Sequence, residues 1–143
     1  MNLFGYSGIA SLDAAIAGAS VTHIDASKKA INLAFENRNR NNLESLPIRY
    51  LVEDAVSFVK KEINRGKKYD GIILDPPKYG RGPNGEIWKI EENLLDLMLQ
   101  IKEILSENPL FLVITSYAIR SSHMSLYNLL KSSLDFDYGK YLS

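Results

Sequence analysis

Short apolar runs alternate with longer amphipathic stretches along this chain. The short runs are rich in Val, Ile, Leu and Phe, and the longer stretches carry apolar residues three or four positions apart. Runs of the first kind are typical of strands buried on both faces, and stretches of the second kind are typical of helices. Their alternation predicts an α/β fold, with a doubly wound, mostly parallel sheet and helices on both of its faces.

Turn and cap residues divide the chain into elements. Ser27 and Asp54 are suitable N-caps, Gly18 and Gly66 are suitable helix stops, and the Gly-rich segment 78–87 is expected to form a loop. The expected strands are a stub at 2–5 and longer strands at 21–25, 48–52, 69–74 and 110–115, the last two fully buried, with a further strand beginning within 135–142. The expected helices are 11–18, 27–40, 54–66, 91–105 and 125–134.

The first expected strand, Asn2-Leu3-Phe4-Gly5, is only a stub. A doubly wound sheet has its first strand near the centre, so the stub suggests a fragment of a longer protein whose first strand is truncated. No internal repeat, low-complexity segment or linker divides residues 1–143, which are expected to form one partial domain.

Composition narrows the possible chemistry. The chain has no cysteine, which excludes zinc–cysteine sites, iron–sulfur clusters and cysteine nucleophiles. His23 and His123 are far apart, so no metal site is expected, and His23 is expected to be packed within its strand. The 17 basic residues balance the 17 acidic ones, which argues against binding nucleic acid by overall charge and leaves local patches possible. No apolar run is long enough for a membrane span and no signal peptide is visible, so a soluble, cytoplasmic protein with no membrane partner is expected.

A glycine-containing turn follows the first strand. Phe4-Gly5-Tyr6-Ser7-Gly8 leads into a small-residue helix, and glycines there would let a ligand lie against bare peptide N–H groups at the helix N-terminus. Taken alone, the segment could equally be a plain turn. It lacks the G-x-G-x-x-G pattern of dinucleotide-binding proteins, because Ile9 and Ala10 follow Gly8.

Acidic residues end the next two strands. Asp25, followed by Ala26 and Ser27, stands 20 residues after Gly5, a spacing at which a carboxylate can accept the hydroxyls of a ribose. Asp54-Ala55 could contact the amino group and a ring nitrogen of an adenine. Each aspartate could equally serve only as a helix cap.

The most specific segment is Asp75-Pro76-Pro77-Lys78-Tyr79-Gly80, directly after the strand at 69–74. A carboxylate at the carboxyl end of a parallel strand faces the ligand crevice, and two prolines stiffen the chain and present their carbonyls outward. Rigid acceptors suit the N–H groups of a planar base, and Tyr79 offers a ring on which a base can stack. A purely structural turn is the alternative.

Three segments, 2–8, 21–27 and 69–80, resemble the Rossmann-type S-adenosylmethionine (SAM)-dependent methyltransferases. Within that class they are most similar to the bacterial large-subunit (23S) ribosomal RNA methyltransferases. The resemblance covers nearly the whole chain and implies a SAM cofactor and an RNA substrate. Such enzymes also carry an upstream RNA-binding region, a full first strand and a C-terminal strand pair, most of which this chain lacks.

The resemblance also implies roles for individual residues. The methionine moiety of SAM would lie over the glycine turn, the ribose on Asp25, the adenine near Asp54-Ala55, and the target base at Asp75 and the Pro76 carbonyl. The implied cofactor-binding set is Phe4, Gly5, Tyr6, Ser7, Gly8, Asp25, Ala26, Ser27, Asp54, Ala55 and Asp75. The implied catalytic set is Asp75, Pro76, Pro77, Lys78 and Tyr79.

One departure from the family bears on the methylated atom. Related enzymes that methylate carbon 5 of cytosine carry a cysteine shortly after the fifth strand, and residues 114–120 contain none. A base nitrogen is therefore the expected target.

Tyr117, Arg120 and His123 could shape the pocket or lie in a surface loop. A basic run could contact phosphates or form a solvated helix end; it consists of Lys60, Lys61, Arg65, Lys67 and Lys68.

The leading interpretation is a SAM-dependent methyltransferase that acts on RNA, ribosomal and at a base nitrogen. A non-catalytic cofactor-binding remnant and a nucleotide-dependent oxidoreductase are the alternatives. Sheet edges left by missing strands could also drive self-association into a homo-oligomer.

Overall fold

The computed structural model describes residues 1–115 and residue 131 of the chain. Apart from Lys131, the expected helix at 125–134 and the expected strand within 135–142 lie outside the described residues, as do Tyr117, Arg120 and His123.

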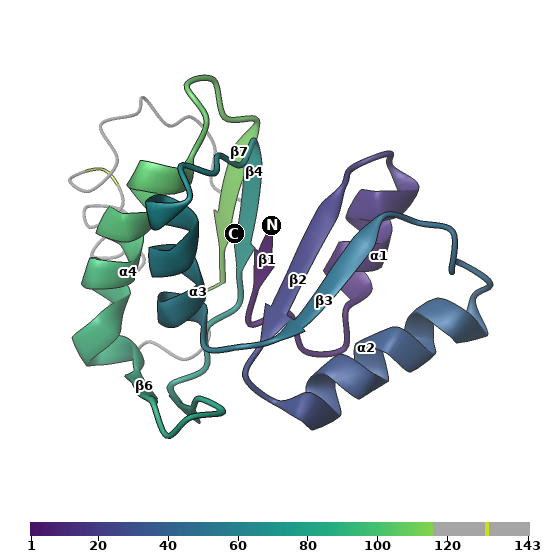
Figure 1. The fold of residues 1–143 in the computed structure, drawn as a ribbon, viewed down its shortest axis with the longest axis horizontal. Coiled ribbons are helices and arrows are strands. Elements are labelled where there is room, and N and C mark those ends of the chain that lie inside the picture. Colours follow the sequence, from purple (N-terminus) through teal and green to yellow (C-terminus); the bar gives the residue numbers. More distant parts are fainter. Residues whose placement is uncertain (116–130, 132–143) are drawn as a thin grey trace.

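Five parallel strands form the central sheet (Figure 1). Their order is β3-β2-β1-β4-β7, with β1 at Asn2–Leu3, β2 at Val21–Asp25, β3 at Ile48–Val52, β4 at Gly71–Leu74 and β7 at Phe111–Ile114. Asn2 lies opposite His23 of β2 and Ile73 of β4. Strands β2 and β3 therefore lie on one side of β1, and β4 and β7 lie on its other side. The strand order reverses between β1 and β4, and open α/β sheets bind ligands at such a switch point.

Two pairs of helices cover the sheet, one pair on each face (Figure 1). Helices α1 (Ile9–Ile16) and α2 (Lys28–Arg40) lie on one side, and α3 (Ala55–Asn64) and α4 (Ile90–Ile104) lie on the other. This arrangement confirms the predicted doubly wound α/β fold. No helix in the described residues is long and apolar enough to cross a membrane.

The expected cap and stop residues of the helices are confirmed, although α1 begins at Ile9 and not at Ser11. The Ser27 hydroxyl accepts the Ala30 N–H at 3.3 Å, and the Asp54 carboxylate accepts the Ser57 N–H at 2.8 Å. Gly18 and Gly66 lie just beyond α1 and α3 with φ of 97° and 62°, a conformation that glycine adopts without steric cost.

The two faces of the sheet are packed differently. The α3–α4 face packs on an apolar core built from Leu3, Ile24, Phe58, Val59, Ile72, Leu74, Leu97, Met98, Ile101 and Ile104. Glu62 of α3 is buried beside this core and accepts hydrogen bonds from Tyr69 and Arg65. The α1–α2 face buries a polar chain: Asn2 donates to the Ser11 hydroxyl at 2.9 Å, and that hydroxyl contacts His23 Nδ1 at 2.8 Å. These hydrogen bonds satisfy groups that would otherwise be costly to bury.

Two expectations are wrong in detail. Residues 78–87 do not form an irregular loop, because β5 (Tyr79–Arg81) and β6 (Ile87–Lys89) pair as an antiparallel hairpin. The run at 110–115 is not fully buried: Phe111 and Val113 are 44% and 46% exposed, whereas Leu112 and Ile114 pack on the α3–α4 core. An apolar run does not reveal which face of a strand is covered.

Candidate active site

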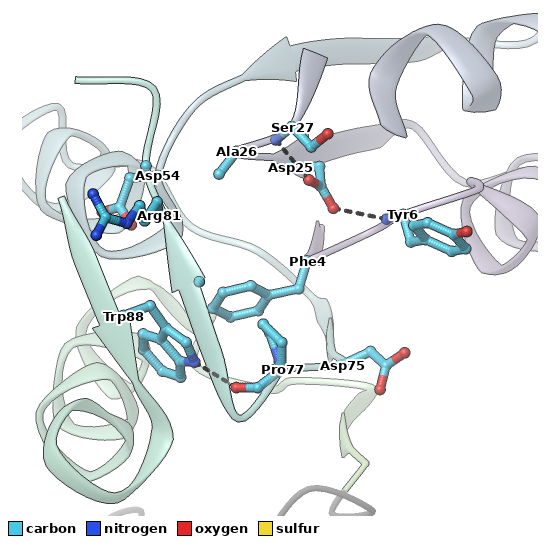
Figure 2. Close-up of a pocket in the computed structure, with 12 residues that line it drawn as sticks. Phe4, Tyr6, Asp25, Ala26, Ser27, Asp54, Asp75, Pro77, Arg81 and Trp88 are labelled. Atoms are coloured by element: carbon cyan, nitrogen blue, oxygen red, sulfur yellow. Dashed lines mark hydrogen bonds between the residues drawn. The ribbon is translucent and has the colours of Figure 1, made fainter. Parts of the chain in front are cut away.

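A cavity of about 410 Å³ opens at the carboxyl ends of the strands, at the switch point (Figure 2). Its volume is within the usual range for small-molecule sites. It is lined by residues that follow β1, β2, β3 and β4 and by the β5–β6 hairpin, namely Phe4, Tyr6, Asp25, Ala26, Ser27, Asp54, Asp75, Pro77, Gly80, Arg81, Gly82 and Trp88.

Asp25 at the end of β2 is held by two backbone groups. The Tyr6 N–H donates to Oδ2 at 3.0 Å and the Ser27 N–H donates to Oδ1 at 2.8 Å. Each carboxylate oxygen can accept a further hydrogen bond. The carboxylate is thus oriented before any ligand arrives and keeps acceptor capacity for two hydroxyl groups.

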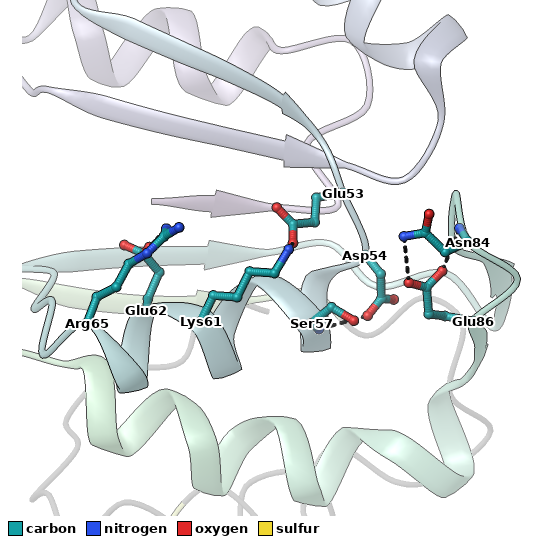
Figure 3. Close-up of polar contacts among 8 residues, drawn as sticks. All are labelled: Glu53, Asp54, Ser57, Lys61, Glu62, Arg65, Asn84 and Glu86. Atoms are coloured by element: carbon teal, nitrogen blue, oxygen red, sulfur yellow. Dashed lines mark hydrogen bonds and ion pairs between the residues drawn. The ribbon is translucent and has the colours of Figure 1, made fainter.

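Asp54, which follows β3, is a helix cap and also a lining residue. It is only 6% exposed, and its Oδ1 accepts the Ser57 N–H that begins α3. Its neighbour Glu53 instead forms an ion pair with Lys61 of α3 (Figure 3). The capping interpretation and the cavity interpretation of Asp54 therefore both hold geometrically.

Asp75 follows β4 and is positioned by two neighbouring strands. Its N–H donates to the Leu3 carbonyl at 3.3 Å, and its Oδ1 accepts the hydroxyl of Thr115, which follows β7. Oδ2 remains as the acceptor that can meet a substrate.

The two prolines after Asp75 differ from the expectation. Pro76 is buried and is not among the lining residues, and the Pro77 carbonyl accepts the indole N–H of Trp88 at 2.7 Å (Figure 2). The expectation that both carbonyls face a ligand is therefore wrong for Pro77. Its ring lines the cavity, while its carbonyl anchors the hairpin.

Aromatic rings form one wall of the cavity. Phe4 packs against Trp88 with ring centroids 4.9 Å apart and an interplanar angle of 52°. Trp88 is 3% exposed. A wall of this kind suits the face of a planar base.

The N–H groups of Gly5 and Gly8 in the glycine turn are not free for a ligand, contrary to the expectation. The Gly5 N–H donates to the Ile24 carbonyl and the Gly8 N–H donates to the Gly5 carbonyl, each at 3.0 Å. A side chain on Gly5 would overlap the His23 ring, and a Cβ on Gly8 would lie 2.7 Å from that of Ala34. These glycines are therefore required by packing beneath the turn.

The backbone of this turn is strained. Phe4 and Tyr6 have φ of 58° and 44°, a left-handed conformation that costs a non-glycine residue roughly 1–2 kcal/mol. Asn37 of α2 donates its side-chain N–H to the Ser7 carbonyl at 2.9 Å and helps to hold the turn in place. Strained segments that are firmly held are common at binding sites.

His23 lies directly beneath the turn and is fully buried. Burial lowers the pKa of the imidazole from 6.5 to about 4, and the nearby Asp25 carboxylate opposes this only in part. The ring is therefore neutral at pH 7, in agreement with the expected packing role. Within residues 1–115 and 131, no cluster of three or more possible metal ligands occurs.

The structure thus separates the expected site residues into two groups. Around the cavity it brings together Phe4, Tyr6, Asp25, Ala26, Ser27, Asp54, Asp75 and Pro77. Outside the lining it places Gly5, Ser7 and Gly8 in the turn, Ala55 in the core, Pro76 beneath the surface, and Lys78 and Tyr79 exposed at the hairpin. Sequence reasoning missed Arg81, Gly82 and Trp88. The β-branched and aromatic pair Ile87-Trp88 was the available signal for the second strand of the hairpin.

The chain is similar in sequence to known proteins. Residues 1–129 match the family described as conserved hypothetical protein 95. The ribosomal RNA large subunit methyltransferase K/L of Shewanella frigidimarina is 36% identical over 110 residues, covering 76% of this chain and 15% of that protein. The protein of the same name from Shewanella loihica is 30% identical over 150 residues, covering 98% of this chain and 21% of its own length. The chain therefore spans about a fifth or less of these curated relatives.

Solved structures show the same fold. The SAM-dependent methyltransferase from Agrobacterium tumefaciens is 51% identical with a TM-score of 0.90, over 92% of this chain and 42% of that chain. The structure of SMU.776 complexed with SAH is 27% identical with a TM-score of 0.83, over 99% of this chain and 37% of that chain. The fold is a Rossmann-like methyltransferase fold.

Proposed function

The chain belongs to the conserved hypothetical protein 95 family, and we propose that it is the SAM-binding part of a methyltransferase that acts on RNA. The observation that carries this proposal is the cavity at the switch point, where carboxylates from three successive strand ends converge on an aromatic wall. The relatives are ribosomal RNA large subunit methyltransferases and the similar solved structure is a SAM-dependent methyltransferase, which supports the same proposal.

The charge of the cavity fits SAM. Among the described residues, its lining holds the carboxylates of Asp25, Asp54 and Asp75 and the guanidinium of Arg81. SAM carries a sulfonium, an ammonium and one carboxylate, so an acidic lining favours it. A dinucleotide would bring a doubly negative pyrophosphate, and the N–H groups of Gly5 and Gly8 already donate to the carbonyls of Ile24 and Gly5. The oxidoreductase alternative is disfavoured on both grounds.

Different residues of the cavity would bind different parts of SAM. Asp25 would accept the ribose hydroxyls, and Asp54 would meet the adenine beside the wall of Phe4 and Trp88. The strained turn would carry the methionine moiety. When bound, SAM supplies a methyl group that is already activated by the positive sulfonium.

Asp75 is the residue that would orient the substrate. With Oδ1 occupied by Thr115, Oδ2 can accept a hydrogen from the amino group of a base and direct the nitrogen into the cavity. Methyl transfer depends chiefly on such alignment and on exclusion of water, so no covalent nucleophile is needed. The absence of cysteine from these 143 residues favours a base nitrogen over carbon 5 of cytosine as the target, and the relatives favour ribosomal RNA. A substrate of this kind would place the protein in the cytoplasm.

Calorimetric titration of the chain with SAM, SAH and NAD tests the cofactor. We expect SAM and SAH to bind and NAD not to bind. Asp25→Ala should weaken SAM binding about 5- to 150-fold, because a charged acceptor is lost. Binding of NAD in place of SAM would contradict the proposal.

Transfer of a radiolabelled methyl group to unmodified large-subunit ribosomal RNA tests the reaction. Asp75→Ala should abolish transfer while SAM affinity stays close to wild type, and Asp96→Asn, an exposed aspartate on α4, is the matched control. Full transfer by Asp75→Ala would remove Asp75 from its proposed role. SAM binding without transfer by the wild-type chain would instead favour a non-catalytic remnant.

A further inference from the structure

We propose that the outward face of the β5–β6 hairpin is a docking surface for single-stranded RNA that flanks the target nucleotide. This inference rests on the proposed function. The surface consists of Tyr79, Arg81, Ile87 and Lys89, and we call it the hairpin face.

The pairing of the hairpin defines this face. Tyr79 lies opposite Lys89, Gly80 opposite Trp88, and Arg81 opposite Ile87. Because side chains alternate along a strand, the first and third pairs project to one side and the middle pair to the other. Trp88 is buried, whereas Tyr79 and Ile87 are 50% and 56% exposed and both cations are exposed.

The side chains of the hairpin face belong to the types that bind single-stranded nucleic acids. Nucleic-acid grooves of this kind combine rings on which bases stack with cations that follow the phosphates. Tyr79 supplies the ring, and its hydroxyl accepts the Arg81 Nε–H at 3.2 Å. This contact orients the ring and leaves both terminal amino groups of the guanidinium for a phosphate.

The charge of the hairpin is locally positive. Residues 78–89 hold the cations Lys78, Arg81 and Lys89 against one carboxylate, in a chain whose total charge is zero. That carboxylate, Glu86, is turned back onto Asn84 (Figure 3). Lys89 pairs with Glu92 at 2.8 Å, but both side chains are at least half exposed, and such surface pairs exchange partners at little cost.

The hairpin face also has the right position. Arg81 belongs to the hairpin face and to the cavity lining, while Gly80 and Trp88 form the cavity wall behind it (Figure 2). Trp88 is anchored to Pro77, so the face is preformed. When the target base of an RNA strand enters the cavity, the adjacent nucleotides would therefore meet the hairpin face. Tyr79 would then stack on a flanking base and not on the target base.

The basic run at the end of α3 is a poorer candidate for the same RNA. Lys61 pairs with Glu53 and Arg65 pairs with Glu62 (Figure 3). Lys68 donates to the Glu103 carbonyl. Helix α3 begins beside the cavity at Asp54 and runs away from it. The last residues of the run therefore lie toward the amino ends of the strands, at the opposite end of the sheet from the cavity.

Fluorescence anisotropy with a labelled single-stranded RNA of about 12 nucleotides tests the proposal. The full 143-residue chain is compared with Tyr79→Ala, Arg81→Gln, Lys89→Gln and the matched control Lys67→Gln over a series of KCl concentrations. Tyr79→Ala should weaken binding about 5- to 150-fold without changing the salt dependence. Arg81→Gln and Lys89→Gln should each reduce the slope of log Kd against log salt by about 0.7.

The control Lys67→Gln should behave as the wild-type chain does, and the SAM affinity of Tyr79→Ala and Lys89→Gln verifies that the variants are folded. RNA binding that is insensitive to all three hairpin variants would overturn this inference and leave the proposed function intact. SAM binding with no RNA binding by the wild-type chain would overturn both this inference and the RNA substrate. RNA binding that depends on the hairpin, without SAM binding, would support the docking surface and contradict the methyltransferase.

Discussion

Trp88 donates its indole N–H to the carbonyl of Pro77 at 2.7 Å, and this bond joins the hairpin to the segment that follows β4. The same indole packs against Phe4, which follows β1. The wall of the cavity, the segment carrying Asp75 and the hairpin are therefore connected through one side chain.

Trp88 should report ligand binding directly. It is the only tryptophan in the chain and it lines the cavity, so a base placed beside it will change its emission. We expect titration with SAM to shift or quench the fluorescence with the same Kd that calorimetry gives. The variant Trp88→Phe provides the blank. Calorimetric binding without any change in emission would place the ligand elsewhere.

Thr115 should control the rate of transfer through Asp75. Thr115→Val removes the hydroxyl that holds Oδ1, so the carboxylate can rotate away from the substrate. We expect the maximal rate of methyl transfer to fall about tenfold, in line with the loss of about 1–2 kcal/mol of hydrogen bonding to a charged group, with SAM affinity unchanged.

Thr115→Ser keeps the hydroxyl and should restore most of the rate. A similar loss in both variants would show that Thr115 acts through packing and not through Asp75.

Asn37 should control cofactor affinity without touching the cofactor. Asn37→Ala removes the bond to the Ser7 carbonyl and loosens a turn in which Phe4 and Tyr6 are strained. We expect the KM for SAM to rise roughly 5- to 10-fold, the equivalent of about 1 kcal/mol, with kcat within about twofold of wild type. Asn39→Ala, on the exposed side of the same helix, is the control. A fall in kcat with an unchanged KM would contradict the positioning role.

His23 should make stability depend on pH below neutrality. The folded state holds its pKa at about 4, whereas the unfolded chain has the ordinary value of 6.5. Between these values the unfolded state binds more protons, so stability is fully present above pH 6.5 and is lost as the pH falls toward 4. The contribution is of order 3 kcal/mol, from a difference of between two and three pKa units.

Urea unfolding at pH 7 and pH 4.5 measures this effect. The wild-type chain should lose more stability between the two conditions than His23→Gln, which cannot titrate. An equal loss in both proteins would assign the acid sensitivity to other groups.

Most of the elements in residues 1–115, and eight of the twelve residues that line the cavity, could be predicted from the sequence. Asp25, Asp54 and Asp75 end successive parallel strands, and such ends must meet at one edge of the sheet, so their convergence could be predicted. The roles of Gly5 and Gly8 could not, because their packing partners His23 and Ala34 belong to other elements. The glycines in residues 78–87 predict a loop, so the hairpin could not be predicted from the sequence. The positions of Arg81 and Trp88 could not be predicted either, because they depend on the pairing of β5 with β6.

The central place of β1 also sets the order in which the sheet can assemble on the ribosome. Asn2 pairs with His23 and with Ile73, roughly 20 and 70 positions further along. At about 5–20 residues per second, β4 emerges several seconds after β1 and β2. Helix α3 precedes β4 in the chain and α4 follows it, so during that interval Leu3 and Ile24 still lack the cover of α4, and the nascent chain presents an apolar surface that chaperones can bind.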